Sequence, residues 1–320
     1  MTINTIYQEP CLDTLRKMPD KYLDSVITSP PYWQLRDYGH PEQWGLEPSY
    51  NEYLEHLWAM MDLIWLKLKD EGTVWINLGD TYGAGMYKTV GRNDSNRLGS
   101  LPNSVTSQIT ATIPKCLLLI PHRFAIGCID RGWIVRNDVI WAKRNGMPES
   151  TVDRFSKKHE YVFFMVKQQK YFFDLDAVRQ ITQTQGDNNN PVLYSHINGK
   201  NPGSVSDFWD IPTKPNSKNH YAVYNDELLR KPILAGSPEF VCKKCGKARK
   251  RIVEIEGFTD CECNAGFSPG IIYDPFMGSG TTAITALRAG RNFIGSEISK
   301  EYCDIANQEV SEFLAQEKLF

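Results

Sequence analysis

The feature that most restricts how this chain can fold is a short apolar run that stops at two consecutive prolines. Residues 24–27 form the run, and Thr28-Ser29-Pro30-Pro31-Tyr32-Trp33 follows it directly. A run of this length predicts a buried parallel strand. The prolines end it in a rigid loop, because they cannot donate backbone hydrogen bonds while their carbonyls still accept them. Ligands of open α/β sheets bind beyond this end of a strand, so we expect a binding site here.

The side chains of this loop suit one kind of ligand. Ser29 carries a hydroxyl that can donate or accept a hydrogen bond, and Tyr32 offers a flat aromatic face. Acceptors gathered beneath an aromatic ring fit a planar base with an exocyclic amino group. The same residues are also compatible with a simple turn, so the loop alone does not define a function.

A second motif near the C-terminus has the arrangement of a nucleotide-binding loop. The predicted strand 271–273 is followed by Asp274-Pro275-Phe276-Met277-Gly278-Ser279-Gly280-Thr281-Thr282, which opens a predicted helix. Its glycines permit a sharp turn and close approach of a ligand to the backbone. The next predicted strand, 292–296, ends in Glu297, about twenty residues beyond the loop, where an acid suits a pair of ribose hydroxyls. Taken alone, this loop would leave NAD binding open.

Together the two motifs resemble those of the beta-class DNA amino-methyltransferases, which modify cytosine N4 or adenine N6. In that family a Ser-Pro-Pro-Tyr-Trp catalytic motif comes first and the S-adenosylmethionine (SAM) loop lies near the C-terminus. The resemblance covers most of the chain. It implies a doubly wound, Rossmann-like α/β sheet of the SAM-dependent methyltransferase type, circularly permuted, with SAM as co-substrate and duplex DNA as partner.

The resemblance also implies which residues form the site. The expected catalytic residues are Ser29, Pro30, Pro31, Tyr32 and Asp80. The expected SAM-binding residues are Cys11, Asp274, Phe276, Gly278, Ser279, Gly280, Thr281, Thr282 and Glu297.

The chain departs from the family pattern at two positions. Family members usually have Gly-Asp-Cys where this chain has Glu9-Pro10-Cys11, and that Asp commonly holds the SAM adenine. Either Glu9 or the backbone amide of Cys11 must then replace the contact. Some relatives carry an acid where Asn77 stands, so this position does not secure a general base. Asp80 is open to two interpretations, a turn residue bonded to its own backbone or a polar contact to SAM or the target base.

Further elements follow from periodicity. We expect a strand, a helix and a strand within residues 3–28, helices at 50–69 and 117–130, and strands at 73–78, 134–141 and 161–166, with 171–173 as hairpin partner of the last. Residues 141–161 resemble the family's loop beside the flipped base. His220 to Pro232 resembles the segment that closes the methionine end of the SAM pocket.

We divide the chain into four parts. Residues 1–180 form the catalytic half, with a long mobile loop at 83–112, and residues 181–235 form a target-recognition excursion. Residues 236–268 form a small zinc-ribbon-like insertion, and residues 269–320 form the SAM-binding half.

The insertion is predicted from cysteine spacing. Cys242 and Cys245 form one short-range pair, and Cys261 and Cys263 form another. Four thiolates in two such pairs are typical of structural zinc, although four reduced thiols in an extended loop would have the same sequence. The basic residues between the pairs suit contact with DNA phosphates. The other cysteines lie in apolar surroundings, and we expect them to be buried thiols: Cys11, Cys116, Cys128 and Cys303.

Charge and hydropathy exclude several classes of protein. The formal net charge is −2, so DNA contacts must come from local patches and not from a generally basic surface. No apolar run reaches membrane-spanning length and the N-terminus lacks a signal peptide, so we expect a cytoplasmic protein of prokaryotic or phage type. The sequence leaves open whether a cognate restriction endonuclease accompanies it, and whether it is a monomer or a homodimer.

Three functions are compatible with these features. The first is DNA cytosine-N4 methylation, which Ser29 and Trp33 favour within the family. The second is the same reaction on adenine N6, which Asp or Asn in place of Ser29 would have favoured. The third is a catalytically silent nucleic-acid reader, against which the intact motifs weigh.

Overall fold

The parallel strands predicted from the apolar runs form the centre of one eight-stranded mixed sheet. The computed structural model describes residues 1–83, 112–146, 149–179, 205–213, 225–252 and 257–317. In spatial order the strands of the sheet are β1 (Thr5–Tyr7), β12 (Asn292–Ser296), β11 (Ile271–Asp274), β2 (Leu23–Thr28), β3 (Leu68–Leu78), β5 (His159–Val166), β4 (Ile134–Ala142) and β6 (Phe208–Asp210). The pairs from β1 to β3 are parallel, and β5 is antiparallel to both of its neighbours.

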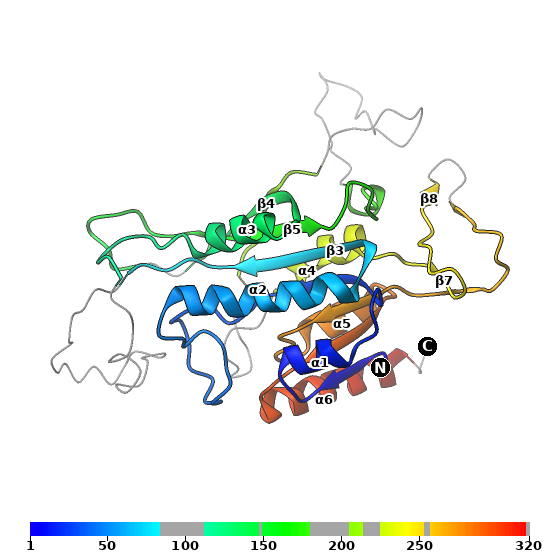
Figure 1. Cartoon of the computed structure of the whole chain (residues 1–320), viewed down its shortest axis with the longest axis horizontal. Coiled ribbons are helices and arrows are strands. Elements are labelled where there is room, and N and C mark those ends of the chain that lie inside the picture. Colours follow the sequence, from blue (N-terminus) through cyan, green and yellow to red (C-terminus); the bar gives the residue numbers. More distant parts are fainter. Residues whose placement is uncertain (84–111, 147–148, 180–204, 214–224, 253–256, 318–320) are drawn as a thin grey trace, which may run out of the picture.

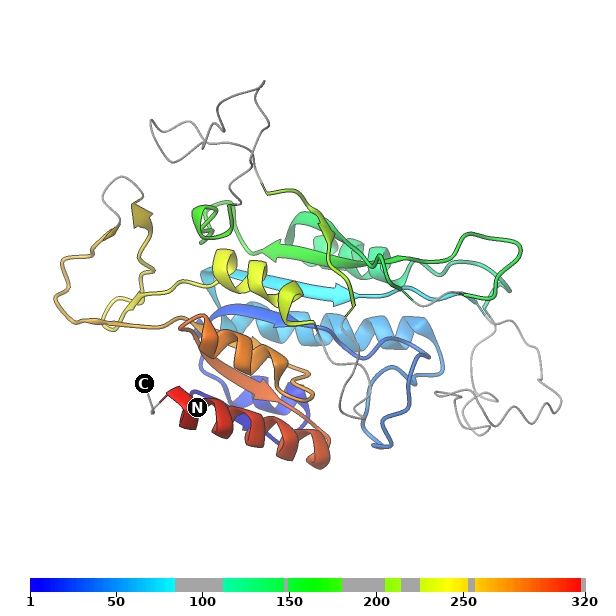
Figure 2. The same ribbon diagram turned by 180° about the vertical axis from the view of Figure 1, so that it is seen from behind.

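Helices cover both faces of the sheet, as Figures 1 and 2 show from opposite sides. One face packs against α1 (Cys11–Lys17), α2 (Tyr50–Lys67) and α3 (Ile120–Asp130). The other packs against α4 (Asp226–Gly236), α5 (Thr281–Arg288) and α6 (Lys300–Glu317). Adjacent side chains of β2 enter different cores, Val26 on the first face and Ile27 on the second. This is why the run reads as continuously apolar: every residue of β2 is buried.

Most predicted elements are present, with shifted ends. The strand expected at 73–78 begins earlier, at Leu68, and the helix expected from 117 begins at Ile120. The first three elements, the helix at 50–69 and the strands at 271–273 and 292–296 are confirmed. No described helix is long and apolar enough to cross a membrane.

One pairing prediction is wrong. Residues 171–173 are not a strand and do not pair with β5. Both edges of β5 are already occupied, by β3 and β4, so no backbone groups remain for a hairpin partner. The amide of Phe172 instead donates to the carbonyl of Glu71 at the start of β3.

The burial predicted for the scattered cysteines holds for three of them. Cys11, Cys128 and Cys303 are buried, whereas Cys116 is exposed, because it lies in a turn that precedes α3. Most of the loop expected at 83–112, much of the excursion 181–235 and the start of the segment at His220 fall outside the described residues.

The cysteine insertion lies near the amino ends of the parallel strands, whereas the proline loop lies at their carboxyl ends. It contains β7 (Val241–Cys242), β8 (Arg251–Ile252), β9 (Gly257–Phe258) and β10 (Phe267–Ser268), in two small antiparallel pairs. Figure 1 shows β7 and β8 beside the end at which β3 begins. Gly270, which immediately precedes β11, donates to the carbonyl of Pro238, and this bond ties the insertion to the starts of the parallel strands.

Candidate active site

The two sequence motifs meet because their strands are parallel neighbours. β11 pairs with β2 and β2 pairs with β3, so the three strands end at the same edge of the sheet. The proline loop leaves β2 there and the glycine loop leaves β11. Thr28 Oγ1 donates to Asp274 Oδ1 over 2.5 Å, and this bond joins the ends of the two strands directly.

Asp274 organises the glycine loop from within the protein. Its carboxylate also accepts the amide of Phe276 at 3.0 Å and the hydroxyl of Thr282 at 2.5 Å. The residue is buried, and burial raises the pKa of its carboxyl group, although these three donors act in the opposite direction. The side chain therefore fixes the loop geometry from its buried side.

The glycines of the loop have the backbone conformations that only glycine adopts at little cost. Gly278 has φ of 53° and Gly280 has φ of 91°. A Cβ on Gly278 would meet no atom within 4 Å, so the space beside this residue is open, whereas one on Gly280 would lie 3.0 Å from Ala306 on α6. The loop thus packs on one side and stays accessible on the other.

Glu297 lies opposite this open position, at the end of β12. Its Oε2 accepts the amide of Gly278 at 2.7 Å and its Oε1 accepts the amide of Ser299 at 2.8 Å. Burial raises the pKa of the carboxyl group. Each carboxylate oxygen can accept a further hydrogen bond, so Glu297 has the capacity to bind a hydroxyl pair.

The segment that departs from the family pattern favours one of the two substitutes for the missing Asp. The carboxylate of Glu9 is directed toward α1, because it accepts from Thr14 Oγ1 at 2.9 Å and pairs with Lys17. The amide of Cys11 belongs to the first turn of α1, where backbone donors lack intrahelical acceptors. The Cys11 carbonyl accepts from Tyr273 Oη at 3.2 Å, which holds this turn against β11. Of the other predicted SAM-binding residues, Thr282 is buried and Phe276, Ser279 and Thr281 are partly exposed.

A hydrogen-bonded group that we call the Ser29 network extends from the proline loop. It consists of Ser29, Tyr32, Asn77, Glu160 and Lys143. Ser29 Oγ lies 3.4 Å from Asn77 Oδ1 and 3.5 Å from Tyr32 Oη. Tyr32 Oη lies 3.1 Å from Asn77 Oδ1 and 2.7 Å from Glu160 Oε2.

The orientation of the Asn77 amide in this network follows from its other partners. Nδ2 donates to the carbonyl of Tyr161 at 3.1 Å and to Glu160 Oε2 at 3.3 Å. A carbonyl and a carboxylate can only accept, so Oδ1 must face Ser29 and Tyr32. Asn77 therefore accepts from the proline loop and donates to β5.

The proline loop is held in place on its far side as well. The Pro31 carbonyl accepts from Tyr53 Oη on α2 at 2.7 Å, and the indole of Trp33 donates to the Glu47 carbonyl at 3.0 Å. Pro30 is buried and Ser29 is partly exposed. A Cβ on Gly79 would lie 2.5 Å from the Tyr32 ring, so the absence of a side chain there lets the ring pack against β3.

A pocket of about 210 Å³ opens beside Tyr32. Its lining includes Gly79, Asp80, Arg154 and Lys157. Burial lowers the pKa of Lys157, whose ammonium group donates to the carbonyl of Asp80. Glu149, Arg154 and Lys157 thus form one wall of this pocket.

The carboxylate of Asp80 is engaged with backbone. Its Oδ1 accepts the amide of Thr81 at 2.9 Å and the amide of Ile120 at 3.1 Å, the first residue of α3. Of the two interpretations open from the sequence, this geometry matches the bond to its own backbone, with helix α3 as an additional partner.

Sequence reasoning placed Glu160 and Lys143 in the right segment but assigned neither a role. Glu160 lies on β5 and Lys143 follows β4, and the bond between their side chains depends on the antiparallel pairing of the two strands. The sequence feature that could have identified Glu160 is its position, because it is an acid beside a buried strand and that strand is predicted to face the proline loop.

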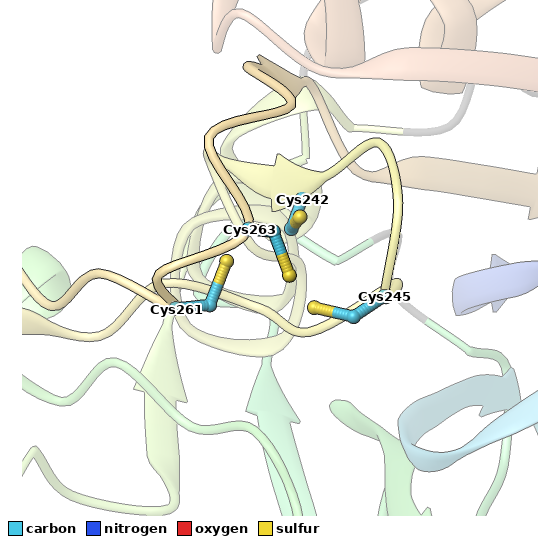
Figure 3. A group of neighbouring side chains, drawn as sticks. All are labelled: Cys242, Cys245, Cys261 and Cys263. Atoms are coloured by element: carbon cyan, nitrogen blue, oxygen red, sulfur yellow. The ribbon is translucent and has the colours of Figure 1, made fainter.

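The four clustered cysteines converge as their spacing predicts. The ligand atoms of Cys242, Cys245, Cys261 and Cys263 all lie within 4.8 Å of one another. Figure 3 shows the four sulfur atoms directed toward a common centre. Tetrahedral zinc with bonds of about 2.3 Å requires sulfur separations of about 3.8 Å, so the donor set and its spacing fit this metal.

Most basic residues of the insertion divide into two groups. Arg249 lies over Phe267 at 4.4 Å and Arg251 pairs with Asp174 at 3.0 Å, so both stabilise the insertion or its attachment. The second group consists of exposed lysines without such contacts to the rest of the protein in the described residues: Lys243, Lys244, Lys247 and Lys250. The insertion that carries them lies where the parallel strands begin, remote from the Ser29 network.

Comparison with known proteins gives a consistent result. A family model described as DNA methylase, of the N6/N4 type, matches residues 23–308. The Type II methyltransferase M.Cfr9I of Citrobacter freundii is 32% identical over 305 residues, covering 94% of this chain and 86% of that protein. The Type II methyltransferase M.SmaI of Serratia marcescens is 31% identical over 298 residues, covering 93% and 87%.

Solved structures share the fold. The PvuII DNA methyltransferase (cytosine-N4-specific) aligns with a TM-score of 0.59 at 15% identity, over 96% of this chain and 90% of that one. A DNA modification methylase of Thermus thermophilus, in complex with S-adenosyl-L-methionine, aligns with a TM-score of 0.55 at 20% identity, over 97% and 93%. The expected methyltransferase-type mixed α/β sheet is thereby confirmed.

Proposed function

Because the chain belongs to the N6/N4 DNA methylases, the beta-class amino-methyltransferases, we propose that it is a site-specific Type II DNA methyltransferase that transfers a methyl group from SAM to cytosine N4. The observation that carries this proposal is the placement of the Ser29 network and the glycine loop at one sheet edge, joined through Thr28 and Asp274. One end offers acceptors for an amino group, and the other offers open space beside Gly278 for a nucleoside. The catalytic loop precedes the glycine loop in the chain, which supports the circularly permuted order.

The cofactor end of the site is proposed to bind SAM along the glycine loop. The open position beside Gly278 and the remaining acceptor capacity of Glu297 suit a nucleoside with free ribose hydroxyls. The amide of Cys11, at the start of α1, replaces the usual Asp as an adenine partner. SAM supplies an electrophilic methyl group on a sulfonium, and the protein has only to align it with the target nitrogen.

At the other end, the proline loop activates a weak nucleophile. The lone pair of an exocyclic amine is delocalised into the base ring. Hydrogen bonds from the amine to Ser29 Oγ and the Pro30 carbonyl localise that lone pair as the transition state forms, which is preorganised electrostatic stabilisation. The nitrogen then displaces the methyl group in line. A base stacked in duplex DNA cannot reach these acceptors, so the target nucleotide must flip out and pack against Tyr32.

The choice of cytosine over adenine rests on Ser29 before the two prolines and Trp33 after Tyr32. The acceptors themselves suit the amino group of either base. The test is to incubate the protein and SAM with unmodified genomic DNA and to identify methylated nucleosides by mass spectrometry. N4-methylcytosine is expected, N6-methyladenine would replace the base assignment, and DNA binding without any methylated nucleoside would favour the silent reader.

We also propose a structural zinc ion at the four cysteines. Four thiolates leave no open position for chemistry, and methyl transfer needs no metal. The zinc would close the loop between β7 and β10 at the edge remote from the pocket. We propose as well that a cognate restriction endonuclease accompanies the protein.

A further inference from the structure

We propose that Glu160 is the positioning residue of the amino-group site: through Tyr32 and Asn77 it orients the acceptors of the amine, and it receives the proton that the methylated amine loses. This inference rests on the proposed methyl transfer to an exocyclic amine and adds a residue to it.

The geometry gives Glu160 two routes to Ser29. Glu160 Oε2 accepts from Tyr32 Oη at 2.7 Å, and Tyr32 Oη lies 3.5 Å from Ser29 Oγ. The same oxygen accepts from Asn77 Nδ2 at 3.3 Å, and Asn77 Oδ1 faces Ser29 Oγ at 3.4 Å. When the Ser29 hydroxyl donates into this network, its lone pairs are left to face an incoming amine.

A carboxylate is the component that the rest of the network lacks. Ser29, Tyr32 and Asn77 are uncharged at neutral pH and cannot compensate the positive charge that develops on the nitrogen. Asp80 Oδ1 is directed to the amides of Thr81 and Ile120. Glu160 is the acid that contacts Tyr32 among the side chains described around this loop, and its charge favours the transition state through Tyr32 and Asn77.

The surroundings keep this carboxylate in place. The Lys143 ammonium group pairs with Glu160 Oε1, and its Nζ also lies 4.3 Å from the centre of the Trp141 ring. The side chain of Glu160 is 14% exposed, so a proton received there can pass to solvent. Lys157, from the segment before β5, also interacts electrostatically with Glu160, and Lys157 in turn faces Asp80.

The proton step balances. The amine nitrogen forms a bond to the methyl carbon while the carbon–sulfur bond breaks, and the electron pair stays on sulfur, which becomes a neutral thioether. The nitrogen, now cationic, releases a proton to Ser29 Oγ as the Ser29 proton moves to Tyr32 Oη and the Tyr32 proton moves to Glu160 Oε2. One positive and one negative charge are thereby lost, and Glu160 is left neutral.

The test is Glu160→Gln, which keeps the shape and the hydrogen-bond acceptor for Tyr32 but removes the charge and the basicity. Single-turnover methylation at saturating SAM and DNA is expected to slow by about 10²-fold, a typical contribution of acid–base catalysis. In the wild type the rate should fall toward acid pH, and Glu160→Gln should lack this fall. Binding of SAM and of DNA and the melting temperature should stay near wild type. Glu55→Gln, an exposed acid on α2 that pairs with Arg131, is the matched control and should change neither rate nor pH profile.

A double variant separates the proposed role from a structural one. Asn77→Asp combined with Glu160→Gln moves the carboxylate to a position whose side-chain oxygen lies 3.1 Å from Tyr32 Oη and 3.4 Å from Ser29 Oγ, while the Gln amide can donate to it. The bond from Asn77 to the Tyr161 carbonyl is lost, so the double variant should regain only part of the wild-type rate. It should recover at least tenfold of the lost rate and restore the fall toward acid pH. A wild-type rate in Glu160→Gln, or a slowed rate that keeps the wild-type pH profile, would overturn the inference. If the wild type methylates no DNA, the proposed function itself fails.

Discussion

Ser29 is the residue on which the proposed chemistry depends most directly, since its hydroxyl stands where the strand β2 opens into the pocket. Tyr32 lies near it because it follows in the same loop, and Asn77 is predicted near it from strand order, because β2 and β3 are parallel and end together. The sequence therefore predicts the side of the site that follows from adjacent strand ends. It does not predict Glu160, which arrives through antiparallel pairing of β5 with β3 across a gap of more than 80 positions.

Ser29→Ala should slow single-turnover methylation by about 10²–10³-fold, the usual cost of one lost transition-state hydrogen bond. A residual rate is expected, because the Pro30 carbonyl remains. Affinities for SAM and DNA should be unchanged, since the hydroxyl contributes to the transition state and not to folding. The measurement is rapid-quench methylation of a DNA that the wild type modifies, and a wild-type rate in the variant would remove Ser29 from the mechanism.

Among the elements, helix α3 shows which properties of a helix can be predicted from burial and periodicity and which cannot. The apolar spacing located the helix but not its first residue, because its start depends on a side chain forty positions away. Leu119 precedes the helix with φ of 56° and offers no side-chain cap. Asp80 at the end of β3 fills that place by accepting the amide of Ile120. The misplaced hairpin at 171–173 has the same origin, because strand order across the sheet decided which edges were free.

The capping role of Asp80 can be distinguished from a catalytic one with two substitutions. Asp80→Ala should lower the free energy of unfolding by about 1 kcal/mol, as for other lost caps. Asp80→Asn retains an oxygen acceptor, so its stability and its single-turnover rate should both stay close to wild type. Denaturant unfolding and rapid-quench assays provide the two measurements. A large loss of rate in Asp80→Asn without loss of stability would instead make Asp80 a proton acceptor.

In the molecule as a whole, the proposed catalytic site and the proposed zinc insertion lie at opposite ends of the parallel strands. Loops at the carboxyl ends of the strands hold the Ser29 network and the glycine loop, whereas the cysteine insertion lies where the strands begin. The spacing of the cysteines predicts their convergence. Their position relative to the pocket depends on strand direction, which no local sequence motif specifies.

The zinc proposal predicts about one zinc ion per chain in protein purified without added metal. Cys261→Ser should lose the metal and destabilise the insertion, whereas Cys116→Ser, at an exposed cysteine outside the cluster, should keep it. Since the cluster is remote from the pocket, the affinity of the metal-free protein for SAM should change little. The measurements are elemental analysis for the zinc content and thermal unfolding for the stability. A metal-free wild type with an ordered insertion would contradict the proposal.

The carboxylate of Asp274 has a consequence for how the two substrates influence each other. Because it bonds to Thr28 beside the proline loop and to Thr282 in the glycine loop, a movement of one loop must displace the other. We therefore expect binding cooperativity. DNA should raise the affinity of the protein for S-adenosylhomocysteine, and S-adenosylhomocysteine should raise its affinity for DNA by the same factor. Calorimetric titration of each ligand with and without the other measures that factor. It should approach one in Asp274→Asn, and a coupling equal to that of the wild type would show that the two sites communicate by another route.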